Sequence, residues 1–119
     1  MVTDQDLKRK REEHQALLEQ ALQDLVERLK AMEGVHRISL FGSFVRGRRD
    51  LFTDLDILVV MDTPMSYVER LRFLYSQVNV PVDLDMLCYT PREFQSLQGT
   101  GRLRRILQEE RVLYERQLL

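Results

Sequence analysis

The chain has 119 residues, of which 44% are hydrophobic and 31% are charged, and its formal net charge is -1. This size and balance predict a single soluble domain over residues 1–119, and the low net charge argues against binding of long nucleic acid through counterion release. The one cysteine, Cys88, excludes an intramolecular disulfide and a multi-cysteine zinc site and favours a reducing cytoplasm. The longest apolar run, residues 57–61, is too short to span a membrane, so we expect neither membrane insertion nor secretion.

The first third of the chain has the pattern of one long helix. Thr3 can cap its start, and Gly34 stands where a left-handed stop residue is expected. Residues 8–13 are charged with ion-pair spacing, so residues 1–16 are expected to project into solvent or to meet a partner, which permits a homo-oligomer without requiring one. Farther along, large apolar residues recur at steps of four and three and predict a buried stripe. This stripe consists of Leu18, Leu22, Leu25, Leu29 and Met32.

Short strands and helices alternate after residue 34. Strands are expected at residues 35–41, 55–60 and 80–87, with a weaker one at residues 112–114. Capping-box sequences predict helices after Ser66 and Thr90, and a further helix is expected over residues 102–110. The order of these elements predicts an α/β fold in which helices cover a sheet. The expected apolar face of the helix after Ser66 consists of Val68, Leu71, Leu74 and Tyr75.

Candidate site residues concentrate between the first two expected strands. Asp54 and Asp56 are two residues apart, and alternate residues of a strand face the same side, so their carboxylates can share one divalent ion. Magnesium prefers such oxygen ligands and would relieve the repulsion between the two charges. Gly42 permits a close backbone approach to a phosphate, and Ser43 offers a hydroxyl and the amides that open a short helical turn. This combination of a glycine-serine turn and two carboxylates therefore predicts a binding site for a metal-bound triphosphate.

Neighbouring charged residues extend this candidate site. Arg46 is nearest the turn and is expected to offset phosphate charge, whereas Arg48 and Arg49 fit solubilising surface charges equally well. A nucleotidyl transfer also needs an acid near the attacking hydroxyl or its metal ion. Asp83 and Asp85 share one face of the third expected strand, and alternation alone does not decide between them.

Three segments together resemble a known family. They are similar to the minimal nucleotidyltransferases of the DNA polymerase β superfamily, and within it to the MNT antitoxins of HEPN/MNT toxin-antitoxin pairs, over about residues 20–115. The segments are Gly42-Ser43-Phe44-Val45-Arg46-Gly47, Thr53-Asp54-Leu55-Asp56-Ile57-Leu58-Val59 and Val82-Asp83-Leu84.

This resemblance implies the nucleotidyltransferase fold, with a small mixed sheet of three to four strands flanked by helices. The turn from Gly42 to Gly47 would bind the nucleotide phosphates. Asp54 and Asp56 would bind magnesium as catalytic ligands, and Asp83 matches the third acid by its position after a valine. Asp85 is then an extra carboxylate.

The resemblance also implies a reaction and a partner. AMP would pass from ATP to a tyrosine hydroxyl of a HEPN-family toxin, with magnesium, expected as two ions, as the cofactor. Two alternatives stay open at this point. The protein could be an antitoxin that masks its toxin without catalysis, or a transferase that acts on a small-molecule hydroxyl, although the latter would normally need an added acceptor-binding domain.

Overall fold

The fold is built on one mixed sheet. The computed structural model describes residues 1–116, and its four strands lie in the order β3-β2-β1-β4. β1 pairs antiparallel with both β2 and β4, whereas β2 pairs parallel with β3. The mixed four-stranded sheet confirms the predicted fold class. The strands are β1 (Val35–Phe41), β2 (Leu55–Met61), β3 (Leu84–Tyr89) and β4 (Arg111–Glu115).

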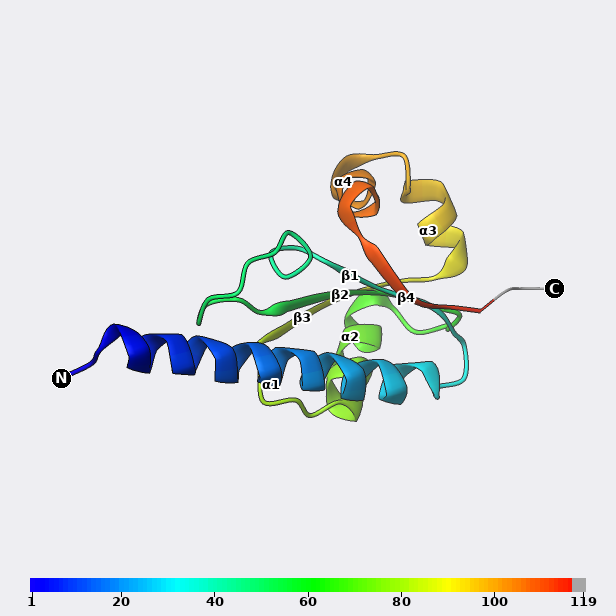
Figure 1. The fold of residues 1–119 in the computed structure, drawn as a ribbon. Coiled ribbons are helices and arrows are strands. Elements are labelled where there is room, and N and C mark those ends of the chain that lie inside the picture. The colour runs from blue at the N-terminus through cyan, green and yellow to red at the C-terminus, as the bar shows by residue number, and fades with distance from the viewer. Residues whose placement is uncertain (117–119) are drawn as a thin grey trace.

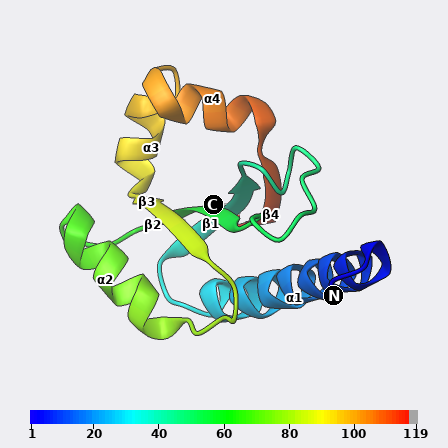
Figure 2. The same ribbon diagram turned by 90° about the vertical axis from the view of Figure 1, so that its left-hand side faces the viewer.

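Helices cover both faces of this sheet. The helices are α1 (Asp4–Lys30), α2 (Tyr67–Gln77), α3 (Pro91–Leu97) and α4 (Gly101–Glu109). α1 and α2 lie on one face, and α3 and α4 lie on the other (Figures 1 and 2). Alternation along β2 sends Ile57 toward the core beneath α1 and Leu58 toward the smaller core beneath α4. Asp56 has the parity of Leu58, so it belongs to the face that α4 covers.

Side-chain caps begin three of the helices. At each start, the side chain of the capping residue accepts a hydrogen bond from the main-chain amide three residues later. The acidic side chain of that later residue accepts one from the main-chain amide of the cap. The capping residues are Thr3, Ser66 and Thr90. These capping boxes confirm the predicted helix starts. α1 ends at Lys30, earlier than expected, and Gly34, with a φ of +89°, forms the turn into β1 instead.

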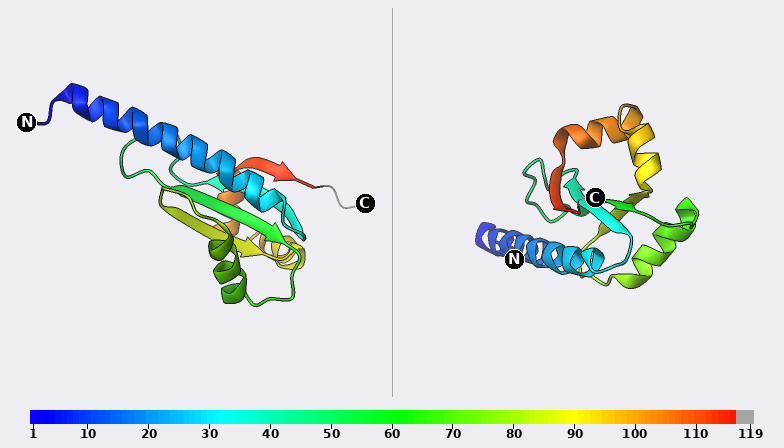
Figure 3. Two further views of the ribbon diagram at one scale, coloured as in Figure 1. Left: turned by 90° about the horizontal axis from the view of Figure 1, so that it is seen from below. Right: turned by 90° about the vertical axis from the view of Figure 1, so that its right-hand side faces the viewer.

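α1 is buried only along its second half. Leu18, Leu22, Leu25 and Leu29 are buried as predicted, whereas Met32 is partly buried beyond the end of the helix. The first turns of α1 are exposed and extend past the edge of the sheet (Figure 3). Within residues 1–116, no helix has the length and apolarity needed to cross a bilayer.

Two expectations about the middle of the chain were wrong. β3 begins at Leu84 rather than at Val80, because the segment around Pro81 bends before it reaches β2. In α2, Val68 and Tyr75 are exposed and Leu71 is partly buried. The buried residues of this helix are Arg70 and Leu74. Arg70 lies inside because its guanidinium is paired with Glu93 at 2.7 Å, which compensates the burial of its charge.

A second paired arginine joins the end of α4 to the sheet. Arg37 of β1 donates to Glu110 at 2.8 Å and to Glu115 at 3.0 Å, and its guanidinium lies over the Phe94 ring. The side chains of Arg37 and Glu110 are only 14% and 8% exposed. The hydrogen bond that Arg37 donates to Glu110 is the main reason that the pKa of Arg37 is raised. This pair anchors α4 beside β1.

Candidate active site

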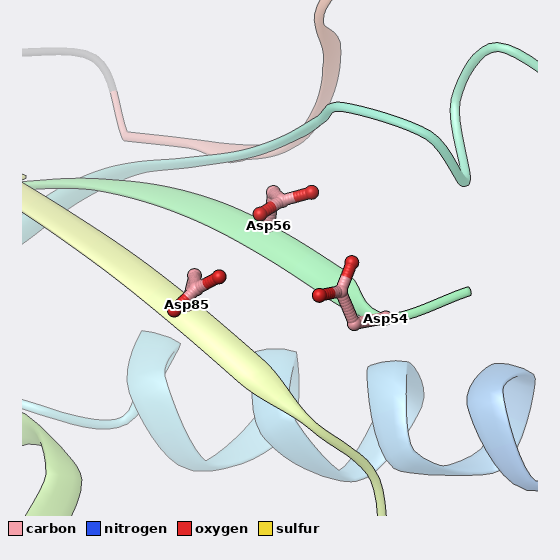
Figure 4. A group of neighbouring side chains, drawn as sticks. All are labelled: Asp54, Asp56 and Asp85. Atoms are coloured by element: carbon pink, nitrogen blue, oxygen red, sulfur yellow. The ribbon is translucent and has the colours of Figure 1, made fainter. Parts of the chain in front are cut away.

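Three carboxylates from two neighbouring strands meet on the α4 face of the sheet. One oxygen of each of Asp54, Asp56 and Asp85 lies within 4.8 Å of the others. Asp56 and Asp85 are direct partners in the parallel pairing of β2 with β3, and Asp54 directly precedes β2. Figure 4 shows the three side chains on the same side of the strands, with α1 on the opposite side. The predicted convergence of Asp54 and Asp56 is therefore present in the structure.

Asp83 does not belong to this group. The resemblance gave the third acidic position to Asp83, but the structure brings Asp85 to the other two carboxylates. Asp83 precedes β3 and is exposed, and its main-chain carbonyl accepts a hydrogen bond from Leu55 at 3.0 Å. The parallel register sets Asp85, and not Asp83, beside Asp56. The geometry therefore favours Asp85 over Asp83 as the third acid, and the catalytic role of either residue stays a prediction.

The electrostatics of the group fit a divalent cation. Burial raises the pKa of Asp56 to about 6, and the negative charges of Asp54 and Asp85 contribute to this rise. A cation among the carboxylates would offset both effects, because it supplies the missing positive charge. Three carboxylates also form the oxygen-only donor set that magnesium prefers. The residues present therefore fit a magnesium ion held by Asp54, Asp56 and Asp85.

The Gly42 turn faces this acidic group. Gly42 has a φ of +80°, and a Cβ at this position would lie 2.1 Å from the Asp56 carboxylate oxygen Oδ2. No side chain larger than hydrogen fits there without moving Asp56. The following residues form hydrogen-bonded turns, as predicted, in which the Arg46 amide donates to the Gly42 carbonyl at 3.2 Å. Glycine is therefore required here by both conformation and space.

The other residues of the turn and the two arginines that follow it differ in their contacts. Ser43 is half-buried, and its hydroxyl forms no hydrogen bond to any group in residues 1–116. Gly47 has a φ of +96° and closes the turn with its amide on the Phe44 carbonyl, at 3.1 Å. Arg49 lies 3.8 Å over the Phe44 ring and also donates to the Phe44 carbonyl, so it holds the turn together. Arg48 pairs with Asp50 at the surface.

Arg46 is engaged by an acidic residue that the sequence did not single out. Its guanidinium contacts the Glu109 carboxylate at 2.9 Å, and the same carboxylate accepts the Gly42 amide at 3.1 Å. The hydrogen bond from Arg46 is the main reason that the pKa of Glu109 is lowered. Glu109 is the last residue of α4, far from the turn in sequence.

α4 forms one wall of a cavity that Asp56 lines from the opposite side. The cavity has a volume of about 440 Å³ and opens beside the Gly42 turn. Arg102, Arg105 and Glu109 line it from one side of α4, and Asp56 lines it from the sheet. The helical spacing of Leu103, Ile106 and Leu107 predicts this helix from its apolar side alone. The spacing of the charged residues along the other side was the signal that could have found them.

Comparisons with known proteins agree with the fold. The sequence profile described as the nucleotidyltransferase domain matches residues 18–114. A structure from Sulfolobus solfataricus described as a nucleotidyltransferase superposes with a TM-score of 0.64 at 18% identity, covering 89% of this chain and 87% of that one. A mutant of the MntA-HpeT toxin-antitoxin complex gives a TM-score of 0.49 at 19% identity, covering 83% and 73%, and this likeness is too distant to bear on function. The search of curated proteins gave no significant match.

The fold, the acidic group and the glycine turn together define a nucleotidyltransferase domain. Because the family profile spans most of the sequence, the chain belongs to the nucleotidyltransferase domain family. The resemblance of the sequence motifs to nucleotidyltransferases is thereby confirmed.

Proposed function

We propose that this protein is a magnesium-dependent nucleotidyltransferase that moves AMP from ATP to a hydroxyl group, in the role of an antitoxin that modifies a tyrosine of a HEPN-family toxin. One observation carries the proposed chemistry: carboxylates from two adjacent strands converge opposite a glycine turn. This arrangement supports joint binding of a metal ion and a triphosphate. The choice of acceptor rests on the resemblance of the motifs to those of MNT antitoxins.

In the proposed reaction the acceptor oxygen attacks the α-phosphorus of ATP. A new bond forms between these two atoms, the bond from the α-phosphorus to the bridging oxygen breaks, and pyrophosphate leaves. Magnesium, when bound, would neutralise charge on the carboxylates and the phosphates. Asp54 and Asp56 would hold the metal position together with Asp85. Asp85 is the exposed member of the group and is therefore placed to accept the hydroxyl proton.

The chain's own groups also orient the triphosphate in this proposal. The Gly42 amide and the Ser43 hydroxyl provide donors at the turn, and Arg46 provides a positive charge. Gly47 keeps the turn closed without a side chain. Positioning of this kind supplies much of the rate in phosphoryl-type transfers, because the reacting groups have little covalent chemistry with the protein.

The test uses ATP labelled at the α-phosphate, magnesium and a HEPN-family protein encoded beside this chain. We expect label on the toxin with the wild-type protein and none with Asp54→Asn/Asp56→Asn. Asp85→Asn should lose labelling, whereas Asp83→Asn should retain it, and thermal melting should show that all variants fold. Labelling by the double variant would refute the site.

Two further outcomes separate the alternatives. A toxin that is neutralised but never labelled would favour an antitoxin that acts by masking. Labelling of a small-molecule hydroxyl in place of the toxin would favour a small-molecule transferase. If Asp83→Asn loses labelling and Asp85→Asn keeps it, the assignment of the third acid from the structure is wrong.

A further inference from the structure

α4 carries a charged face that the motif residues do not explain. Arg102, Arg105 and Glu109 follow one another at steps of three and four, which places them along one side of the helix. All three line the cavity above the sheet. Within residues 1–116, the guanidinium groups of Arg102 and Arg105 form no hydrogen bond or ion pair. Two positive charges without a partner among the described residues thus line the same cavity as Asp56.

Glu109 already occupies an anion position at the turn. Its Oε1 accepts the Gly42 amide at 3.1 Å, and its Oε2 lies 2.9 Å from the Arg46 guanidinium. A main-chain amide and a guanidinium are the donors that phosphate oxygens use. The lowered pKa of Glu109 keeps the carboxylate ionised at neutral pH. The protein therefore places its own anion on the donors of the predicted triphosphate site.

We propose that α4 is the second wall of a polyphosphate site, in which Glu109 holds a phosphate position until a triphosphate displaces it and Arg102 and Arg105 bind the incoming phosphates. The proposal rests on the proposed function, because it names the triphosphate donor of that reaction as the ligand. Glu109 would then determine which ligands bind, because only a ligand with enough negative charge to displace its carboxylate can bind at the Gly42 turn.

Charge and space support the displacement. Two anions cannot share the Gly42 amide and Arg46, because like charges at contact distance repel strongly without a cation between them. The Glu109 side chain is 30% exposed and stands at the end of α4, so it has solvent to rotate into. Arg105 and Arg102 lie about one and two turns back from Glu109 along the same cavity, where the outer phosphates would reach.

Glu115 gives a matched control. Its largely exposed carboxylate also pairs with an arginine, Arg37, but it does not line the cavity beside the turn. Neutralising Glu109 or Glu115 therefore removes one partly exposed ion pair in each case, and only the first frees the phosphate donors. If Glu109 merely stiffened the turn, its loss would weaken ligand binding, which is the opposite sign to the one expected for a competitor.

The experiment measures binding of ATP, tripolyphosphate and adenosine to the full chain by titration calorimetry in magnesium. Glu109→Gln and Glu109→Ala should bind ATP and tripolyphosphate about two- to fivefold more tightly, the range expected for a partly exposed ion pair. Arg105→Gln should bind both several-fold more weakly, Glu115→Gln should match the wild type, and the affinity for adenosine should be the same in all variants.

Unchanged or weaker binding by both Glu109 variants would overturn the proposal. Tightening of adenosine binding would overturn it as well, because adenosine has no phosphate. The binding measurements need no acceptor hydroxyl, so a negative result in them would not contradict the labelling experiment. Conversely, a wild type that binds tripolyphosphate but labels no toxin would refute the proposed function and not the role of α4.

Discussion

Gly42→Ala tests whether the turn and Asp56 form one site. The new Cβ would lie 2.1 Å from Asp56 Oδ2 and 2.8 Å from Cγ, and the oxygen would have to retreat to about 3.4 Å to restore ordinary contact. Asp56 would thus move by more than about 1 Å, a displacement that can cost on the order of 100-fold in rate at a reacting centre. The positive φ of +80° adds strain of about 1–2 kcal/mol for a residue with a Cβ.

Gly101→Ala separates the two effects. Gly101 has a φ of +52°, and a Cβ there meets no atom within 4 Å, so this variant carries the backbone strain without the clash. Both variants should melt several degrees below wild type, about 4 °C per kcal/mol of strain. Binding of Mn²⁺, followed by electron paramagnetic resonance, should weaken at least about tenfold in Gly42→Ala only. Equal Mn²⁺ affinities in the two variants would show that Asp56 is not part of the metal site.

Further predictions concern pH, a buried ion pair and the core. Asp56 has a raised pKa of about 6, so Mn²⁺ affinity should be constant above that pH and fall as the proton competes below it, and Asp56→Asn should remove this dependence. Because the pKa of Asp56 is raised in the folded protein, lowering the pH through 6 should stabilise the metal-free protein. A melting temperature that falls over this pH range would contradict the raised pKa. Arg37→Met should cost about 3–5 kcal/mol in urea unfolding, because Glu110 is left buried and unpaired; a loss below about 1 kcal/mol would show that Glu110 finds water. Leu18→Ala should cost about 2–5 kcal/mol in the same measurement, whereas Leu17→Ala, at a side chain that is 44% exposed, should stay within about 0.5 kcal/mol; equal losses would place the wrong face of α1 in the core.

Local chemistry made half of the site predictable. Gly42 and the pair Asp54 and Asp56 follow from conformational preference and strand alternation, which neighbouring residues determine. The third acid depends on the register between β2 and β3, because a slip of two residues exchanges Asp85 for Asp83 without turning any side chain to the other face. Register is a tertiary property, so the choice between the two acids had to wait for the structure.

The partners of buried charges were also beyond sequence reasoning. Arg70 reads as a surface residue of α2 and is buried because Glu93, on α3, pairs with it. From the sequence alone, Glu109 is an ordinary residue at the end of a helix. It contacts the Gly42 turn because α4 packs over the sheet at that point. Such pairs depend on where two distant elements meet. The capping boxes at Ser66 and Thr90, in contrast, were predicted because each is complete within four residues.

The N-terminal turns of α1, which extend past the sheet, affect the hydrodynamic behaviour of the protein. The protein measures 55 × 28 × 26 Å, so its long axis is about twice its other two. A rod-like extension of this kind raises friction, and a monomer of 14.2 kDa should travel through a sizing column as if it were heavier. Sedimentation or light scattering, which report mass, would distinguish an elongated monomer from a dimer.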